Sequence, residues 1–284
     1  MLLVSQSLAI AGEHSHLPDA TPDLIATRIS QESASAWQKN ALPSAQEAKY
    51  KNAIAQAEML DAIVPGEFSS TLTFTSNYVF RGISQTNNTA AIQGSFDYSL
   101  GLSDAASVYA GIFGSNVDFN DGDQATLEVD LYAGAAYQIS DRLSSDLTAY
   151  YYLYPGADSD LNYDYLEFVA NAGYDLEKAN LGATLSHAPD NFASSGTAIY
   201  TEGRVDVPLP QNISLNAALG YQSIEDNTAF GAPDYVNWSV GAGYSIVGFD
   251  LALKYTDTDL SSSECFGGTD LCEGRVVFSA SRTF

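Results

Sequence analysis

Residues 273–284 read EGRVVFSASRTF and close the chain on a phenylalanine. Counting back from Phe284 in steps of two gives a mostly apolar face: Arg282, Ala280, Phe278 and Val276. The positions between them are mostly polar: Thr283, Ser281, Ser279, Val277 and Arg275. Alternation with a period of two is typical of a β-strand that has one apolar and one polar side. The segment therefore predicts a C-terminal strand.

A last strand that ends on an aromatic residue is typical of bacterial outer-membrane β-barrels. Lipid offers no hydrogen-bond partner to an open sheet edge, so a membrane-spanning sheet must close on itself. We therefore expect an all-β fold, a closed antiparallel transmembrane β-barrel in the bacterial outer membrane. Its expected partners are outer-membrane lipid and, through Phe284, the barrel-assembly machinery.

The same alternation continues upstream and divides residues 67–284 into strands. In the predicted strand at 125–139, Leu127, Val129 and Leu131 share one face, whereas Glu128 and Asp130 share the other. Single-chain bacterial barrels have an even number of strands, and about twelve can be marked here. They are 69–82, 90–100, 106–119, 125–139, 142–154, 163–175, 179–187, 197–208, 213–223, 234–246, 249–257 and 273–284.

The connections between these strands alternate in length. Those after even-numbered strands are short: 101–105, 140–141, 176–178, 209–212 and 247–248. Those after odd-numbered strands are mostly longer: 83–89, 155–162, 188–196, 224–233 and 258–272. Membrane barrels have short periplasmic turns and longer outer loops, whereas a β-sandwich gives no reason for such alternation. The pattern favours a barrel with both ends of the strand region in the periplasm.

Aromatic residues on the predicted lipid face fall at two levels, as in the aromatic girdles at the two membrane interfaces. The loop-side group contains Tyr78, Phe80, Tyr221, Trp238 and Tyr255. The turn-side group contains Tyr98, Tyr137, Tyr174, Tyr244, Phe249 and Phe284. Packing in a soluble core explains any one ring but not two separate levels.

Composition narrows the class further. The 284 residues include 11 Lys and Arg against 35 Asp and Glu, a formal net charge of -24. Phosphate recognition needs clustered basic residues, so nucleic acid is excluded as a partner. Mean hydropathy is -0.08, and no apolar run approaches the roughly 18 residues of a spanning helix. A chain of this composition enters a membrane only as a barrel.

The N-terminal part lacks the strand pattern. Leu2–Ala11 is apolar and ends on a small-x-small sequence, but no Lys or Arg precedes it; we expect residues 1–11 to be the remnant of an export signal, or else an irregular start. Residues 12–66 are expected to form a periplasmic extension. Within it, the capping-box pair Ser44 and Glu47 predicts a helix over 44–64. This helix is expected to be a tether, a plug of the lumen or a site where copies of the chain associate.

The only cysteines, Cys265 and Cys272, lie close together in a predicted outer loop. This spacing predicts a small disulfide in an oxidising compartment, which agrees with export. A zinc site would need four ligands, and no histidine is near, so no metal is expected there.

Several motifs in residues 75–119 carry a family resemblance. The first is a Ser-x-Tyr-x-x-Arg-Gly-x-Ser-Gln-Thr core made of Ser76, Tyr78, Arg81, Gly82, Ser84, Gln85 and Thr86. It is followed by Gln93-Gly94, Tyr109–Gly111 and Ser115–Phe119, and later by the stretches 128–137 and 150–156. These motifs resemble the TorF-like porin family of proteobacterial outer-membrane proteins.

The resemblance covers residues 68–284, and the first hairpin is its specific part. It implies an outer-membrane barrel and no established transport substrate. The chain departs from the pattern in its first 66 residues and at Ala90, where proline is expected.

The predicted polar face assigns charged residues to the lumen, with nine acids against five bases. They are Arg81, Asp97, Glu128, Asp130, Arg142, Asp146, Glu167, Asp175, Glu202, Arg204, Asp206, Asp250, Lys254 and Arg275. Carboxylates lining a pore lower the barrier for cations, which favours a porin-like channel for passive diffusion of small polar or cationic solutes. The alternative is that these charges pair and fill a narrow lumen, with Glu202, Arg204 and Asp206 suited to that.

Two other classes of function compete with a channel. A structural or adhesive barrel would bind partners or assemble through its helix and acidic loops. An outer-membrane hydrolase is disfavoured, because the only barrel histidine, His187, is adjacent to Ser186 and neighbours on a strand point to opposite faces. The acidic loops 120–123 and 158–160 are expected to be solvated rather than to bind Ca²⁺. No cofactor is expected.

Overall fold

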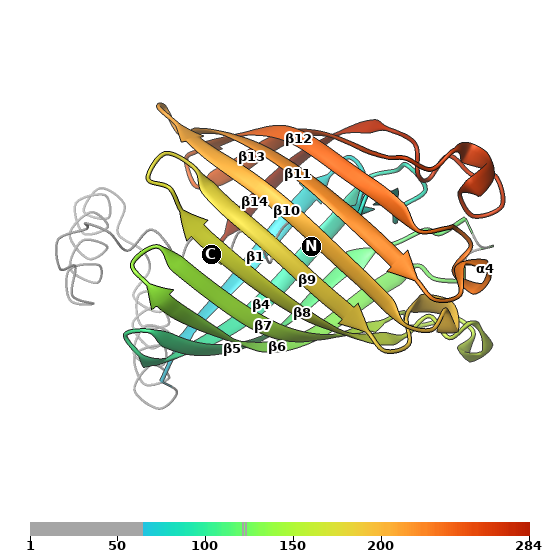
Figure 1. Cartoon of the computed structure of the whole chain (residues 1–284), viewed down its shortest axis with the longest axis horizontal. Helices are drawn as coiled ribbons and strands as arrows, with labels where there is room; N and C mark the ends of the chain where they lie inside the picture. Colours follow the sequence, from blue (N-terminus) through green and yellow to red (C-terminus); the bar gives the residue numbers. More distant parts are fainter. Residues whose placement is uncertain (1–64, 121, 123) are drawn as a thin grey trace, which may run out of the picture. The chain divides into compact units, whose positions relative to one another are not determined.

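Twelve β-strands form a closed antiparallel barrel in the computed structural model, which describes residues 65–120, 122 and 124–284 (Figure 1). Each strand pairs with its neighbours in the chain, and β1 also pairs with β14. The strands are β1 (Glu67–Thr75), β4 (Ala91–Ser103), β5 (Ala106–Asn116), β6 (Leu127–Ser140), β7 (Leu143–Leu153), β8 (Tyr165–Asp175), β9 (Asn180–Ala188), β10 (Ala198–Leu209), β11 (Ile213–Ile224), β12 (Tyr235–Ile246), β13 (Phe249–Thr258) and β14 (Arg275–Thr283).

The C-terminal strand closes the barrel, as its alternation predicts. Thr71 of β1 pairs with Thr283 of β14, and their hydroxyls are 2.9 Å apart. Phe284, just beyond β14, exchanges backbone hydrogen bonds of 2.9 and 3.2 Å with Ser70 of β1. Pairing at this seam leaves no strand with a free edge, which is the condition for a sheet to span lipid.

The connections at the two ends of the barrel differ in length, as predicted. Tight turns join β4 to β5, β6 to β7 and β12 to β13, and in the last of these Val247 and Gly248 have positive φ angles of 51° and 75°. Longer connections at the other end carry η1 (Ser159–Leu161), η2 (Phe192–Ser194), α4 (Asn227–Phe230) and η3 (Ser262–Glu264). We call these the turn end and the loop end.

Large apolar side chains cover the outer face of the barrel. Leu219 is 61% exposed, Leu147 57% and Leu253 56%, whereas the residues on either side of each along its strand face inward. A continuous band of exposed apolar residues is unfavourable in water and matches the lipid face of a membrane barrel. Among the residues that the structure describes, no helix is long and apolar enough to span a membrane.

The first predicted strand, 69–82, is wrong in its second half. The strand β1 ends at Thr75, and residues 76–90 fold inward as a loop that contains the short strands β2 (Val79–Phe80) and β3 (Ile83–Ser84). We call residues 76–90 the inner hairpin. Tyr78 is 6% exposed and lies inside the barrel, so Tyr78 and Phe80 are not part of a lipid-facing girdle. Arg81 and Gly82 turn the chain with positive φ, which the alternation of apolar residues cannot reveal.

The N-terminal predictions lie outside the described residues. They are the export-signal remnant at 1–11 and the helix at 44–64, and of the extension 12–66 only Pro65 and Gly66 are described.

Candidate functional site

The inner hairpin crosses the lumen and touches strands on opposite sides of the barrel. The hydroxyl of Tyr78 donates to Oε1 of Glu128 on β6 at 2.7 Å. The backbone N–H of Ser84 donates to the carbonyl of Leu271 in the β13–β14 loop at 2.9 Å. Since the contacts lie on widely separated strands, the hairpin obstructs the passage between the two ends.

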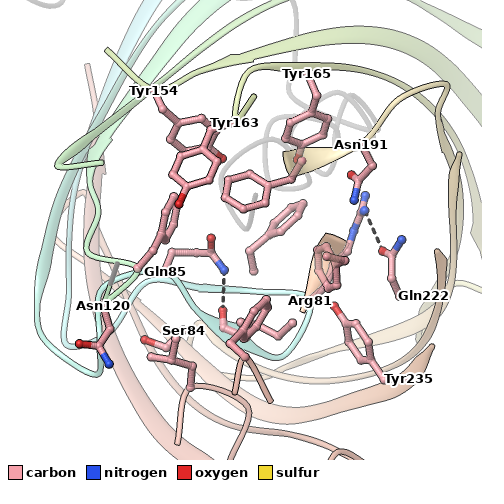
Figure 2. A pocket seen from close by; sticks show the side chains of 17 residues that line it. Arg81, Ser84, Gln85, Asn120, Tyr154, Tyr163, Tyr165, Asn191, Gln222 and Tyr235 are labelled. Atoms are coloured by element: carbon pink, nitrogen blue, oxygen red, sulfur yellow. Dashed lines mark hydrogen bonds between the residues drawn. The ribbon is translucent and has the colours of Figure 1, made fainter. Parts of the chain in front are cut away.

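Arg81, at the tip of the hairpin, binds several strands of the barrel. Its Nη2 donates to Oε1 and Oε2 of Glu167 at 2.8 and 3.0 Å and to Oγ of Ser186 at 2.8 Å. Its Nη1 donates to Oε1 of Gln222 at 3.0 Å (Figure 2). The guanidinium also lies over the ring of Tyr200, 4.2 Å from its centroid. These partners belong to the four consecutive strands β8, β9, β10 and β11.

The Arg81–Glu167 pair is almost fully buried, with side-chain exposures of 6% and 1%. A buried charge is costly unless it is paired and hydrogen-bonded, and here each partner supplies what the other needs. The pair therefore fixes the hairpin tip against one side of the barrel.

Gly82 fixes the tip against the next part of the barrel. Its φ is 85°, and a Cβ atom placed on it would lie 2.5 Å from Cγ2 of Thr258 and 2.9 Å from Cβ of Asn237. Those residues are on β13 and β12, so no larger residue fits here without moving the hairpin.

Side-chain hydrogen bonds within the hairpin hold its shape. Oγ of Ser84 donates to Oδ1 of Asn77 at 2.7 Å, and Oγ1 of Thr86 accepts from the backbone N–H of Tyr78 at 3.1 Å. Thr86 also donates to the carbonyl of Thr89 at 2.6 Å. The motif residues Tyr78, Arg81, Gly82, Ser84 and Thr86 therefore form one structural unit, which the sequence pattern alone did not explain.

Most lumen carboxylates are bound by tyrosine hydroxyls rather than by basic side chains. Glu128 accepts from Tyr78 and Tyr154, Glu167 from Tyr152, Asp97 from Tyr132, Asp146 from Tyr109 and Glu202 from Tyr200. Within the described part of the chain only two ion pairs are within 4.0 Å, and Arg81–Glu167 is the only one inside the barrel. Arg204 donates to Thr184 at 3.1 Å instead of pairing with Glu202 or Asp206.

Other predicted lumen charges lie elsewhere. Arg142 is exposed in the turn between β6 and β7 and pairs with Glu177 in another turn, so its lumen assignment is wrong. Asp175 and Asp250 are exposed at the turn end. Arg275 is at the loop end of β14, where it binds Asn88 of the inner hairpin and, at 2.7 Å, the carbonyl of Asp270. Asp130, Asp206 and Lys254 occupy inward positions of β6, β10 and β13.

The disulfide loop, within the connection between β13 and β14, packs against the inner hairpin. Cys265 and Cys272 form the predicted disulfide, and both are fully buried. They pack in an apolar cluster with Ile83 of the hairpin and with Leu271. Oγ1 of Thr258 donates to the carbonyl of Cys272 at 2.8 Å, which ties this loop to β13.

Replacing both cysteines by serine is expected to lower the free energy of unfolding of the disulfide loop by about 2 kcal/mol. The barrel should stay closed. The loop holds the inner hairpin through the Leu271 carbonyl, which accepts from Ser84, and through Oδ1 of Asp270, which accepts from Asn88 at 2.9 Å, so openings of the hairpin become more frequent. Limited proteolysis within 259–272 and bilayer recordings of the double variant measure these two effects. Dithiothreitol should reproduce them in the native chain and add nothing in the double variant. Unchanged proteolysis would show that the disulfide does not restrain the loop.

Exposed carboxylates in the loops serve loop geometry. Glu225 accepts from the backbone N–H of Thr197 at 2.8 Å, and this hydrogen bond lowers the pKa of Glu225. Glu264 accepts from the hydroxyl of Ser261 at 2.6 Å, which lowers the pKa of Glu264 likewise.

In the described residues, no three metal-ligating side chains converge on one point. Ser186 faces the lumen and binds Arg81, whereas His187 is exposed on the outside of β9.

A pocket of about 290 Å³ lies at the loop end, over the inner hairpin (Figure 2). Arg81, Gln222 and Tyr235 border it on one side, and Tyr154 and Tyr163 border it on the other. The sequence pattern does not reveal this pocket, because its lining comes from the hairpin, five separate loops and the loop ends of β8, β11 and β12. The recurrence of aromatic residues in the longer connections is the one feature of the sequence that points to this pocket.

Comparisons with known proteins identify one family. The family described as "Bacterial protein of unknown function (Gcw_chp)" matches residues 60–284. The comparisons do not name the TorF-like family. No curated protein sequence is significantly similar to the chain.

Similar solved structures include porins and an outer-membrane channel. The NanC porin is 10% identical, with 76% of this chain and 99% of that chain covered and a TM-score of 0.48. The KdgM porin in complex with disordered oligogalacturonate is 6% identical, with 76% and 98% covered and a TM-score of 0.46. An outer-membrane channel from Pseudomonas putida F1 is 13% identical, with 78% and 97% covered and a TM-score of 0.45.

Proposed function

Since the chain belongs to the Gcw_chp family of bacterial proteins of unknown function, we propose from its geometry that it is an outer-membrane diffusion channel for small cationic or neutral polar solutes. In this proposal the inner hairpin is the gate. The observation that carries it is the acidic lumen in which tyrosine hydroxyls, rather than basic side chains, bind the carboxylates.

Charge balance favours cations in this lumen. A tyrosine hydroxyl satisfies a carboxylate oxygen without cancelling its charge, whereas an ion pair would remove the field that attracts cations. Acidic side chains outnumber basic ones on the inner face of the strands. The acids are Asp97, Glu128, Asp130, Asp146, Glu167, Glu202 and Asp206, and the bases are Arg204, Lys254 and, at the loop end of β14, Arg275, besides Arg81 of the inner hairpin.

Inward-facing glycines leave room along the wall in the turn-end half. At Gly134 an added Cβ would lie 2.6 Å from the ring of Tyr109, and at Gly182 it would lie 2.5 Å from Nε of Arg204. These side chains therefore lie flat on neighbouring strands instead of projecting across the lumen. In the proposed channel, this arrangement supports a lined passage below the hairpin.

Neutralising three lumen carboxylates is expected to reduce cation selectivity. The triple variant Asp97→Asn, Glu202→Gln and Asp206→Asn keeps side-chain size, so the barrel should fold as before. Under a KCl gradient across a planar bilayer, its reversal potential should move from the cation-selective side toward zero.

Glu177→Gln is the matched control, since Glu177 pairs with Arg142 outside the lumen and its loss should not change the reversal potential. Anion selectivity in the native chain, or an unchanged potential in the triple variant, would contradict the proposed function.

A structural or adhesive barrel is the second candidate. The observation that favours it is the number of strands that hold the inner hairpin, because a fixed hairpin would keep the lumen closed. A chain that stays silent in bilayers after removal of the hairpin would support this candidate and exclude the channel.

A further inference from the structure

Two groups of aromatic rings line the loop-end pocket. In the first, Phe192 stacks on Tyr163, with centroids 4.3 Å apart and planes at 18°, and Phe119 meets Phe192 edge-on at 5.4 Å. In the second, Phe230 and Phe266 are 5.4 Å apart. From these rings we infer that the pocket binds the ring of a neutral pyranose sugar.

The aromatic faces suit such a ring. One side of a pyranose presents C–H groups with no hydroxyl between them, and these pack on the electron-rich face of an aromatic ring. Because two separate groups of rings line the pocket, more than one aromatic face is available to a sugar. The volume of about 290 Å³ is near the lower limit for small-molecule sites, which indicates one ring rather than a long chain.

Polar groups around the pocket match the hydroxyls of a sugar. Tyr165 and Tyr235, which carry hydroxyls, and Asn120, which carries a side-chain amide, line the pocket. The amide of Gln85 donates to the carbonyl of Ile83 at 3.0 Å, which leaves its Oε1 without a described partner. Hydroxyl and amide groups both donate and accept, as sugar hydroxyls do, whereas a purely aromatic ligand would leave them unsatisfied.

The charge of the pocket selects an uncharged ligand. No acidic residue lines it, although the chain contains 35 of them, and its one charged residue, Arg81, is bound by Glu167. An anionic sugar would find the guanidinium already occupied, and a cation would find no carboxylate. The inference goes beyond the proposed channel, since binding at the loop end does not require passage through the lumen.

Saturation-transfer NMR on the full chain tests the inference. The protein is kept in lauryldimethylamine oxide, because detergents with sugar head groups would compete for the pocket. D-glucose and D-galactose are expected to show transfer, whereas mannitol, which has no ring, and D-galacturonate are not. Transfer to phenol but to neither neutral sugar would overturn the inference, as would stronger binding of galacturonate than of galactose.

Variants place the binding in this pocket. Phe192→Ala is expected to weaken sugar binding roughly tenfold through loss of a stacking face. Tyr165→Phe removes only a hydroxyl and is expected to weaken binding less, with folding unchanged. Phe96→Ala is the matched control, since Phe96 is 72% exposed on the outer face of β4. Equal binding in all three variants would overturn the inference, whereas a silent channel that still binds sugar would contradict only the proposed function.

Discussion

Replacing residues 77–89 by a short glycine–serine linker is expected to raise the single-channel conductance severalfold. The change removes Arg81, Tyr78 and the other groups that cross the lumen, so the obstruction is lost. The barrel should still close, because Thr75 of β1 pairs directly with Ala91 of β4 and a tight turn can connect them. Planar bilayer recordings measure the conductance, and heat-modifiable mobility in gels verifies folding.

The matched control is the same linker in place of residues 157–161. These residues belong to a loop-end connection, and none of them lines the pocket. Its conductance should equal that of the native chain. A folded hairpin-deletion variant with native conductance would show that the inner hairpin does not control the passage.

Arg81→Gln is expected to destabilise the folded barrel by about 3 kcal/mol, because it leaves the buried carboxylate of Glu167 without its charged partner. Ser186 and Tyr152 still bind Glu167, but neutral hydroxyls do not replace the guanidinium. Urea-induced unfolding in detergent micelles, followed by tryptophan fluorescence, measures the loss. Adding Glu167→Gln to Arg81→Gln should recover part of it.

The exposed pair Arg142–Glu177 provides the comparison. Solvent screens this pair, so Arg142→Gln should leave unfolding unchanged within error. If Arg81→Gln unfolds at the same urea concentration as Arg142→Gln, the buried pair does not anchor the hairpin.

The fold could be predicted because lipid imposes a simple pattern on the sequence. Leu127, Val129 and Leu131 must meet hydrocarbon while Glu128 and Asp130 face inward, and this alternation is visible without knowing any partner strand. The alternating lengths of the connections could also be predicted, because tight turns lie at one end of the barrel and longer loops at the other.

The site could be predicted only in part, because it depends on the register in which neighbouring strands pair and on the turn that takes residues 76–90 into the barrel. Tyr154 reaches Glu128 because β6 and β7 pair Val129 with Leu153, and sequence periodicity does not fix such a register. The inner hairpin also continues the alternation of β1, so Tyr78 and Phe80 were assigned to the lipid face. Arg142 was assigned to the lumen because alternation was extended through a turn.

The seam between β1 and β14 joins residues 212 positions apart in sequence. Such a distant pairing is formed late and slowly, after the chain between the two strands has been ordered. The segment of residues 76–90 sits just after β1, so it must be enclosed before the ring is completed or enter afterwards from one mouth. A chain that lacks β14 can neither complete the ring nor enclose this segment within it.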